Sequence, residues 1–119
     1  MDNKEFGKQL ESRTRRFANR IIRLSASLPN SPESKVVRNQ ITKSGTSIGA
    51  NYREANRARS NADFKNKICE SEASETVYWL EIIADFDWIA AQQVKEIIKE
   101  ANELLAIFTS IGVKLISKT

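Results

Sequence analysis

The sequence predicts an all-α fold: an up-down-up-down four-helix bundle that assembles into a homo-oligomer. Two observations predict the bundle. Apolar residues recur every three or four positions over four segments of similar length, and both prolines fall in one stretch, LPNSPES (28–34). Four helices of this kind, joined by short loops, bury their apolar stripes by packing antiparallel to their neighbours. A length of 119 residues suits a single domain, 1–119.

The first two expected helices flank the proline-containing stretch. A helix over 3–28 is interrupted only by Arg13, which lies within its apolar stripe of Phe6, Leu10, Phe17, Ile21, Leu24 and Leu28. Ser31 is placed to cap a second helix, with Pro32 in its first turn, where a missing N–H costs little. This helix should end near Arg57, with a stripe of Val37, Ile41, Ser44, Ile48, Tyr52 and Ala55.

The last two expected helices occupy the C-terminal half. Ser60 and Asp63 resemble a capping box, so a third helix should begin there and end near Phe86. Its main stripe is Phe64, Ile68, Ser71, Glu75, Tyr78, Trp79, Ile82 and Phe86. A fourth helix follows a connection over 85–92, and its stripe is Val94, Ile97, Ala101, Leu104, Phe108, Ile111 and Leu115.

Two surfaces exceed what a monomeric bundle needs. The third helix has a second apolar stripe on its opposite side, formed by Ala73, Val77, Leu80 and Ala84. The second helix has a surface of small residues, Thr46, Gly49 and Ala50, away from its core stripe. A helix that is apolar on two faces is expected to be buried on both, so these residues are the predicted oligomer interface. The alternative is that small apolar residues stand on exposed faces by chance.

Polar residues inside the stripes predict a central polar layer. Matching the midpoints of the parallel first and third helices brings Arg13 level with Glu75, and Ser44 lies near the same level. An unpaired charge in a core is costly, whereas a hydrogen-bonded Arg–carboxylate pair is tolerated. The simplest role for such a layer is to fix the register of the helices. The alternative is that one or both charges reach solvent at the stripe edge.

The sequence lacks the residues that catalytic and metal sites usually require. The chain has no histidine and one cysteine, Cys69, so it offers neither a Cys/His metal site nor a familiar nucleophile–base pair. The carboxylate pairs Glu72/Glu75 and Glu81/Asp85 lack the histidines of di-iron bundles, and there is no glycine-rich phosphate loop. We therefore expect no enzyme activity, no metal and no cofactor. With no apolar run approaching about 18 residues and no internal disulfide, we expect a cytoplasmic protein without membrane contact.

Charge is unevenly distributed. Residues 1–28 and 29–62 each carry a net +4, residues 63–88 carry −5 and residues 89–119 carry +1. The candidate nucleic-acid-binding residues are arginines off the core stripes of the first two helices: Arg15, Arg16, Arg23, Arg53 and Arg57. Lys8 adds to them. The alternative is an ordinary solvated face, although symmetric repetition in an oligomer would enlarge each basic patch.

The segments SGTSIGANYREANRARSNADFKNK (44–67) and ETVYWLE (75–81) resemble the bacterial four-helix-bundle proteins of the 23S ribosomal RNA intervening-sequence family. The resemblance covers nearly the whole chain. It implies a homopentamer with a central channel and, by analogy, a nucleic acid or nucleoprotein partner. Asn51 and Glu54 match the family motif, whereas Ala55 replaces its usual glycine.

Together these patterns predict a non-enzymatic, homo-oligomeric bundle that binds RNA, DNA or a nucleoprotein through the basic faces of its first two helices. The alternative is a protein–protein interaction scaffold or accessory subunit with no direct role in nucleic-acid binding. No small-molecule substrate is expected.

Overall fold

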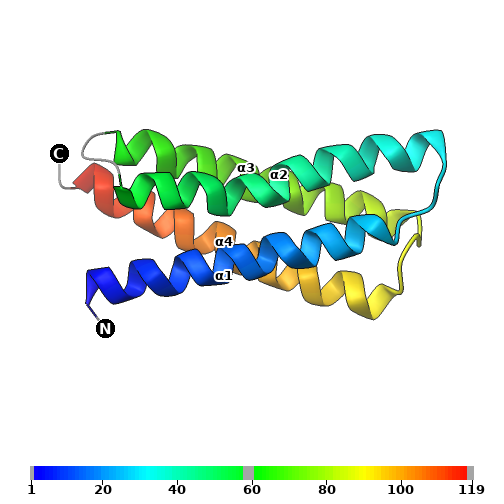
Figure 1. Cartoon of the computed structure of the whole chain (residues 1–119), viewed down its shortest axis with the longest axis horizontal. Coiled ribbons are helices and arrows are strands. Elements are labelled where there is room, and N and C mark those ends of the chain that lie inside the picture. The colour runs from blue at the N-terminus through cyan, green and yellow to red at the C-terminus, as the bar shows by residue number, and fades with distance from the viewer. Residues whose placement is uncertain (1, 58–60, 118–119) are drawn as a thin grey trace.

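The computed structural model describes residues 2–57 and 61–117, which form four helices (Figure 1): α1 (Asn3–Ala26), α2 (Pro32–Arg57), α3 (Ala62–Asp85) and α4 (Ala91–Ser117). Successive helices run in opposite directions, so the start of α1 and the end of α4 lie at the same end of the molecule. The molecule measures 46 × 25 × 20 Å. The predicted up-down four-helix bundle is confirmed.

The helix boundaries follow from local capping chemistry. Asp2 Oδ1 accepts a hydrogen bond from the Glu5 amide at 2.7 Å, which satisfies one free N–H at the start of α1. Ser31 Oγ accepts from the Ser34 amide at 3.1 Å, as the predicted cap of α2 requires. At α3 the predicted cap, Ser60, lies outside the described residues. The residue directly before α3 is Asn61, which has a left-handed backbone conformation (φ 66°) and makes no side-chain capping bond.

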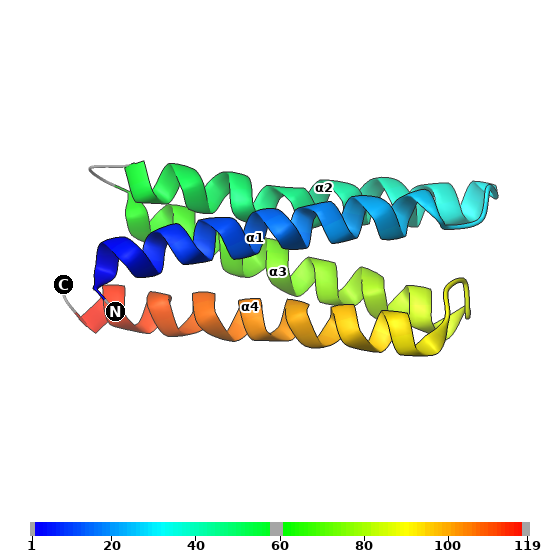
Figure 2. The same cartoon turned by 60° about the horizontal axis from the view of Figure 1, so that its bottom comes forward.

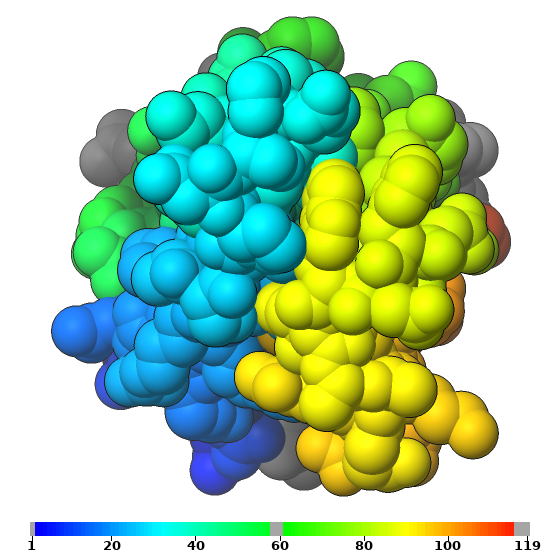
Figure 3. All heavy atoms as spheres, turned by 90° about the vertical axis from the view of Figure 1, so that its right-hand side faces the viewer, coloured from blue at the N-terminus to red at the C-terminus, as the bar shows by residue number. Residues whose placement is uncertain are grey.

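The α1–α2 and α3–α4 connections lie side by side at one end of the bundle, coloured cyan and yellow in Figure 3. Arg38 of α2 fixes the first, because its Nη2 donates to the carbonyls of Leu28 at 2.6 Å and Pro29 at 3.1 Å. In the second, the rings of Phe86 and Trp88 stack with centroids 5.1 Å apart. Both connections are therefore held by specific contacts.

The core of α1, α2 and α4 consists largely of the predicted stripes. Buried members are Leu10, Phe17, Ile21, Leu24, Val37, Ile41, Ile48, Tyr52, Val94, Ile97, Ala101, Leu104 and Phe108. Tyr52 and Phe108 join α2 to α4 across the core by an edge-to-face contact at 5.5 Å. Phe6 departs from the prediction, since 40% of it is exposed.

The two faces of α3 are the reverse of the prediction. Ala73 and Leu80, predicted to form an oligomer interface, are completely buried in the bundle, and Val77 packs against the core while Ala84 is exposed. Of the predicted core stripe, Phe64, Ser71, Glu75, Tyr78 and Phe86 are exposed, whereas Trp79 and Ile82 are partly buried against the core. Glu75 gives the physical reason: it stands in the middle of the aromatic stripe, and burying its carboxylate would cost more than exposing the rings.

α1 lies close to α2 because of two glycines. A Cβ on Gly45 would lie 2.8 Å from Ile21 Cγ2, and a Cβ on Gly49 would lie 3.0 Å from Thr14 Oγ1. Gly49, predicted to contact another subunit, therefore serves the approach of α1 within the chain. The spacing of four residues puts both glycines on the side of α2 that faces α1.

The fourth side of the bundle is the least closely packed. α1 packs along α2, α2 along α3 and α3 along α4, whereas α1 and α4 approach at only a few positions (Figure 2). Shallow grooves of about 460 and 590 Å³ lie along this α1–α4 seam, and both include Phe6 and Ile107. Over the part of the chain that the structure describes, no helix is long and apolar enough to cross a membrane.

Candidate nucleic-acid interface

Three of the five predicted nucleic-acid-binding arginines meet in one groove. Arg15 of α1 faces Arg53 and Arg57 of α2 across a groove of about 480 Å³. A smaller adjoining hollow adds Lys8 to Arg15 and Arg53. All four side chains are exposed, so their charged groups are accessible to an anionic ligand. We call Lys8, Arg15, Arg53 and Arg57 the arginine groove.

The acidic residues of this groove already have partners within the chain. Glu11 accepts from Asn56 Nδ2 at 2.9 Å and lies 3.6 Å from Arg53 Nε. Glu54 Oε2 accepts from Lys65 Nζ of α3 at 2.7 Å. The Lys65 ammonium lowers the pKa of Glu54 through this hydrogen bond and its charge, so Glu54 is ionised at neutral pH. Although Glu11 offsets Arg53, the four basic side chains still outnumber the two carboxylates of the groove.

The other two predicted arginines, Arg16 and Arg23, lie on a different side of α1. Arg16 borders the groove that contains Arg13 and Ile107, and Arg23 follows it at seven residues on the same helix face. Arg20, which the sequence prediction omitted, belongs with them: Arg16 and Arg20 both help to lower the pKa of Glu100 on α4. The spacing of four and three residues from Arg16 to Arg23 is the signal that could have identified it.

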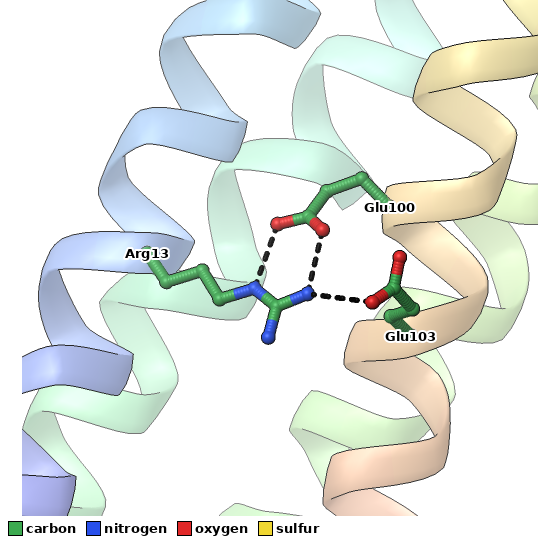
Figure 4. Close-up of polar contacts among 3 residues, drawn as sticks. All are labelled: Arg13, Glu100 and Glu103. Atoms are coloured by element: carbon green, nitrogen blue, oxygen red, sulfur yellow. Dashed lines mark hydrogen bonds and ion pairs between the residues drawn. The ribbon is translucent and has the colours of Figure 1, made fainter.

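The predicted polar layer of Arg13, Ser44 and Glu75 does not form. Arg13 reaches α4 instead, where Nε donates to Glu100 Oε2 at 2.8 Å and Nη2 donates to Glu100 Oε1 at 2.6 Å (Figure 4). Nη2 also contacts Glu103 Oε1 at 3.4 Å. Glu75 is exposed on the outer side of α3. The prediction failed because α1 and α3 are diagonal in the bundle, with α2 and α4 between them.

Ser44 takes part in a different buried contact. Its Oγ lies 2.9 Å from Thr76 Oγ1 of α3, and Thr76 Oγ1 lies 2.7 Å from the Glu72 carbonyl oxygen. Both residues are completely buried. Two small hydroxyl side chains therefore join α2 to α3 at the centre of the bundle without placing a charge there.

The remaining small residues of the predicted oligomer interface line the arginine groove. Thr46, Gly49 and Ala50 form its α2 wall beside Arg53. Thr46 Oγ1 donates to the Thr42 carbonyl at 2.7 Å within its own helix. Small side chains here leave the long arginine side chains room to lie along the groove.

Burial raises the pKa of two groups considered in the sequence analysis, Cys69 and Glu72. Cys69 is completely buried, its Sγ lies 3.6 Å from the Ile48 carbonyl, and burial raises the pKa of its thiol to about 12. Burial, followed by repulsion from Glu75, raises the pKa of Glu72. Within the described ranges, no group of three or more His, Cys, Asp and Glu residues could hold a metal ion.

Residues 9–110 match the family model of the 23S rRNA-intervening sequence protein. The chain belongs to this family. It is 38% identical to a protein of unknown function from the S23 ribosomal protein family of Bacteroides thetaiotaomicron, whose crystal structure superposes with a TM-score of 0.78. The similarity covers 86% of this chain and 96% of that chain. No functionally curated protein matches the chain.

The intervening-sequence family motif, as it stands in this chain, has two structural contacts. Asn51 Nδ2 donates to the Ser47 carbonyl at 2.9 Å, one turn earlier in α2. Glu54 joins α2 to α3 through Lys65. Ala55, which replaces the usual glycine, lies within α2 and is half-buried. Glu54 also lines the arginine groove.

Proposed function

We propose that this intervening-sequence family protein is a non-enzymatic, homo-oligomeric bundle that binds RNA or DNA through the arginine groove. One observation carries the proposal: Arg15 from α1 and Arg53 and Arg57 from α2 line the same accessible groove. Guanidinium groups bind phosphate through paired hydrogen bonds, and their planes stack on bases. The groove follows the helix axes, as binding of an extended phosphate backbone requires.

Assembly would strengthen this binding. A single groove offers four basic side chains, which is a small electrostatic footprint for nucleic acid. A symmetric oligomer, which we propose to be a pentamer, repeats the groove around its axis and joins several weak contacts on one strand. The number five rests on the family resemblance.

The test is a comparison of nucleic-acid affinity at several salt concentrations. Fluorescence anisotropy with a structured RNA and a mixed-sequence DNA duplex would be measured for the native protein and for Arg53→Ala/Arg57→Ala. The double variant should bind all sequences more weakly. On duplex DNA, its slope of log K against log salt should fall by about 0.9 for each phosphate that the variant no longer neutralises.

The matched control is Lys95→Ala/Lys99→Ala, which removes two exposed charges from α4, outside the groove. It should retain most of the native affinity. No binding by the native protein at low salt, or equally weakened binding by both double variants, would contradict a role for the groove.

A protein-interaction role is the second candidate, because α3 leaves large aromatic side chains exposed. In that case the oligomer is an accessory subunit, and nucleic acid has no direct part. Affinity purification after nuclease treatment would then recover one other protein in a fixed ratio, while the purified bundle would not shift RNA or DNA.

A further inference from the structure

The outward side of α3 exposes large apolar side chains. Phe64 and Tyr78 of α3 are 60% and 56% exposed, and Phe86, at the C-terminal cap of α3, is 64% exposed. Trp79 and Ile82 lie between them, partly buried, and Tyr78 packs edge-to-face on Trp79 at 5.0 Å. Clustered exposed apolar side chains on a soluble protein mark an interaction surface more often than scattered ones do. We call this surface the α3 outer face.

Acidic side chains accompany the α3 outer face. Asp63, Glu75, Glu81 and Asp85 are exposed on α3, whereas its exposed basic side chain is Lys67. Glu75 lies in the middle of the aromatic residues and close enough to Glu72 to repel it. The face is therefore apolar and negatively charged, which disfavours phosphate groups and favours a surface that is both apolar and basic.

The same chain presents such a surface. On the side of α1 that faces α4, Arg16, Arg20 and Arg23 repeat at four and three residues, and all three are exposed. Phe6 and Ile107 provide apolar surface along the adjacent α1–α4 seam. We call Arg16, Arg20 and Arg23 the basic flank of α1. It is separate from the arginine groove, which opens on the α2 side of the same helix.

We propose that the α3 outer face of one subunit packs against the basic flank of α1 of a second copy of this chain. The contact joins two different surfaces, so each subunit uses one face for each of two neighbours. Such a head-to-tail contact builds assemblies larger than a dimer, which close into a ring when the rotation between subunits permits. It leaves the arginine groove open on every subunit.

Charge decides against a symmetric contact between two α3 outer faces. Two such faces would bring Glu75 and its acidic neighbours together, and like charges buried in an interface disfavour association. The head-to-tail arrangement instead brings carboxylates to guanidinium groups around an aromatic centre, the composition typical of stable interfaces. This inference rests on the assembly part of the proposed function.

Aromatic substitutions give the first test. Light scattering and native mass spectrometry would compare the native protein with Tyr78→Asp/Phe86→Asp. The native protein should form an assembly larger than a dimer, and the variant should fall to the 13.5 kDa of one chain. Its helical circular dichroism should persist, because both residues are more than half exposed in the single chain. An assembled variant, or a monomeric native protein at micromolar concentration, would overturn the proposal.

The control is Ile22→Asp, which introduces one aspartate at an apolar residue 48% exposed on α1. Ile22 follows Arg15 by seven residues, so it lies on the groove side of α1 rather than on the basic flank. It should leave the assembly intact. Dissociation equal to that of the α3 variant would contradict the assignment of the interface.

Charge reversal tests the pairing of the two surfaces. Glu75→Arg/Asp85→Arg should dissociate the assembly, and so should Arg16→Glu/Arg23→Glu. Combining all four changes in one chain should restore it, because the two surfaces are again opposite in charge. A symmetric contact between α3 faces would remain repelled in the combined variant, so failure of this rescue would reject the head-to-tail pairing.

The nucleic-acid measurement keeps the two proposals separate. The monomeric Tyr78→Asp/Phe86→Asp variant retains the arginine groove and should still bind RNA, more weakly than the assembly, and adding Arg53→Ala should weaken it further. Unchanged assembly in the α3 variant together with native RNA affinity would reject the interface alone. An intact head-to-tail assembly that binds no nucleic acid would reject the groove alone.

Discussion

Arg13 and Glu100, 87 residues apart in the sequence, join the first and last helices of the bundle by two parallel hydrogen bonds of 2.8 and 2.6 Å. They cross the α1–α4 seam, where the two helices otherwise approach at only a few positions. Their side chains are 31% and 19% exposed, so the pair is shielded from water but not buried. This ion pair therefore links α1 to α4 on the least closely packed side of the bundle.

Glu100→Gln should lower the free energy of unfolding by about 1 kcal/mol, because the amide can accept only one of the two charge-assisted bonds. Chemical denaturation measures this effect. Glu103→Gln is the control: its contact to Arg13 is longer, at 3.4 Å, and its side chain is 52% exposed, so it should change stability less. A double-mutant cycle with Arg13→Met would give the coupling energy.

The stabilisation by Glu100 should disappear in acid. The hydrogen bond from Arg13 and the arginine charges lower the pKa of Glu100 below its ordinary value of 4.5. A lowered pKa in the folded state gives stability that is present above pH 4.5 and is lost as the pH falls through the lowered value. The difference between native protein and Glu100→Gln, measured by denaturation at several pH values, should therefore close below pH 4.5. A constant difference would contradict this linkage.

Ionised Glu72 should lower the stability of the protein at neutral pH, whereas ionised Glu100 raises it. Burial, with repulsion from Glu75, raises the pKa of Glu72 above the ordinary 4.5, so its ionisation at neutral pH opposes folding. Glu72→Gln should raise the free energy of unfolding by up to about 0.5 kcal/mol at pH 7. The gain should vanish as the pH falls below 4.5, where the unfolded carboxyl is protonated as well. Glu81→Gln, an exposed change on the same helix, is the control.

Gly45→Ala should destabilise the protein although alanine is the better helix former. The new Cβ would lie 2.8 and 2.9 Å from the γ carbons of Ile21, a completely buried, β-branched side chain with little freedom to move. Overpacking of this kind costs about 1–3 kcal/mol, against about 1 kcal/mol gained in helix propensity. In Gly7→Ala the Cβ meets only the amide of Asn56 at 3.3 Å, and this exposed side chain can move aside. Thermal unfolding should show a lower Tm for the first variant alone.

Cys69 should be inert in the folded protein. Its thiol is completely buried, and its pKa is raised to about 12, so it lacks both access and the thiolate form. Ellman's reagent at pH 8 should react with it only as fast as the chain unfolds, and at once in denaturant. Rapid reaction under native conditions would show that α2 and α3 separate readily at this point.

Local pattern was sufficient for much of the fold. The spacing of apolar residues predicted four helices, and the burial of Phe17, Ile48 and Leu104 confirms the core side of three of them. Ser31 was identified as a cap from its residue type and from Pro32 in the turn that follows, and its bond to the Ser34 amide confirms this. For α3 the same method failed, because both of its faces have apolar residues at helical spacing. Glu75, central in the larger stripe, was the signal that this stripe faces outward.

Only part of the candidate site could be predicted from the sequence. Exposed arginines on two helices could be recognised, but which of them share a groove depends on which sides of α1 and α2 meet. Arg15 proved to face Arg53 and Arg57, whereas Arg16 and Arg23 lie toward the α4 side. Arg13 was predicted to pair with Glu75 because the sequence indicated only how far along the bundle axis each residue lies. In the structure Arg13 pairs with Glu100 instead.

By itself, the sequence determined the number of helices, their approximate limits and the residue types available to each face, because helix formation and capping depend on neighbours within a few positions. Only the tertiary structure decided which face of α3 is buried, which glutamate holds Arg13 and which arginines stand together. These outcomes depend on how far each helix rotates about its axis and which helices are adjacent. Close packing of small residues such as Gly45, Ala73 and Thr76 sets that rotation, and no single helix encodes it alone.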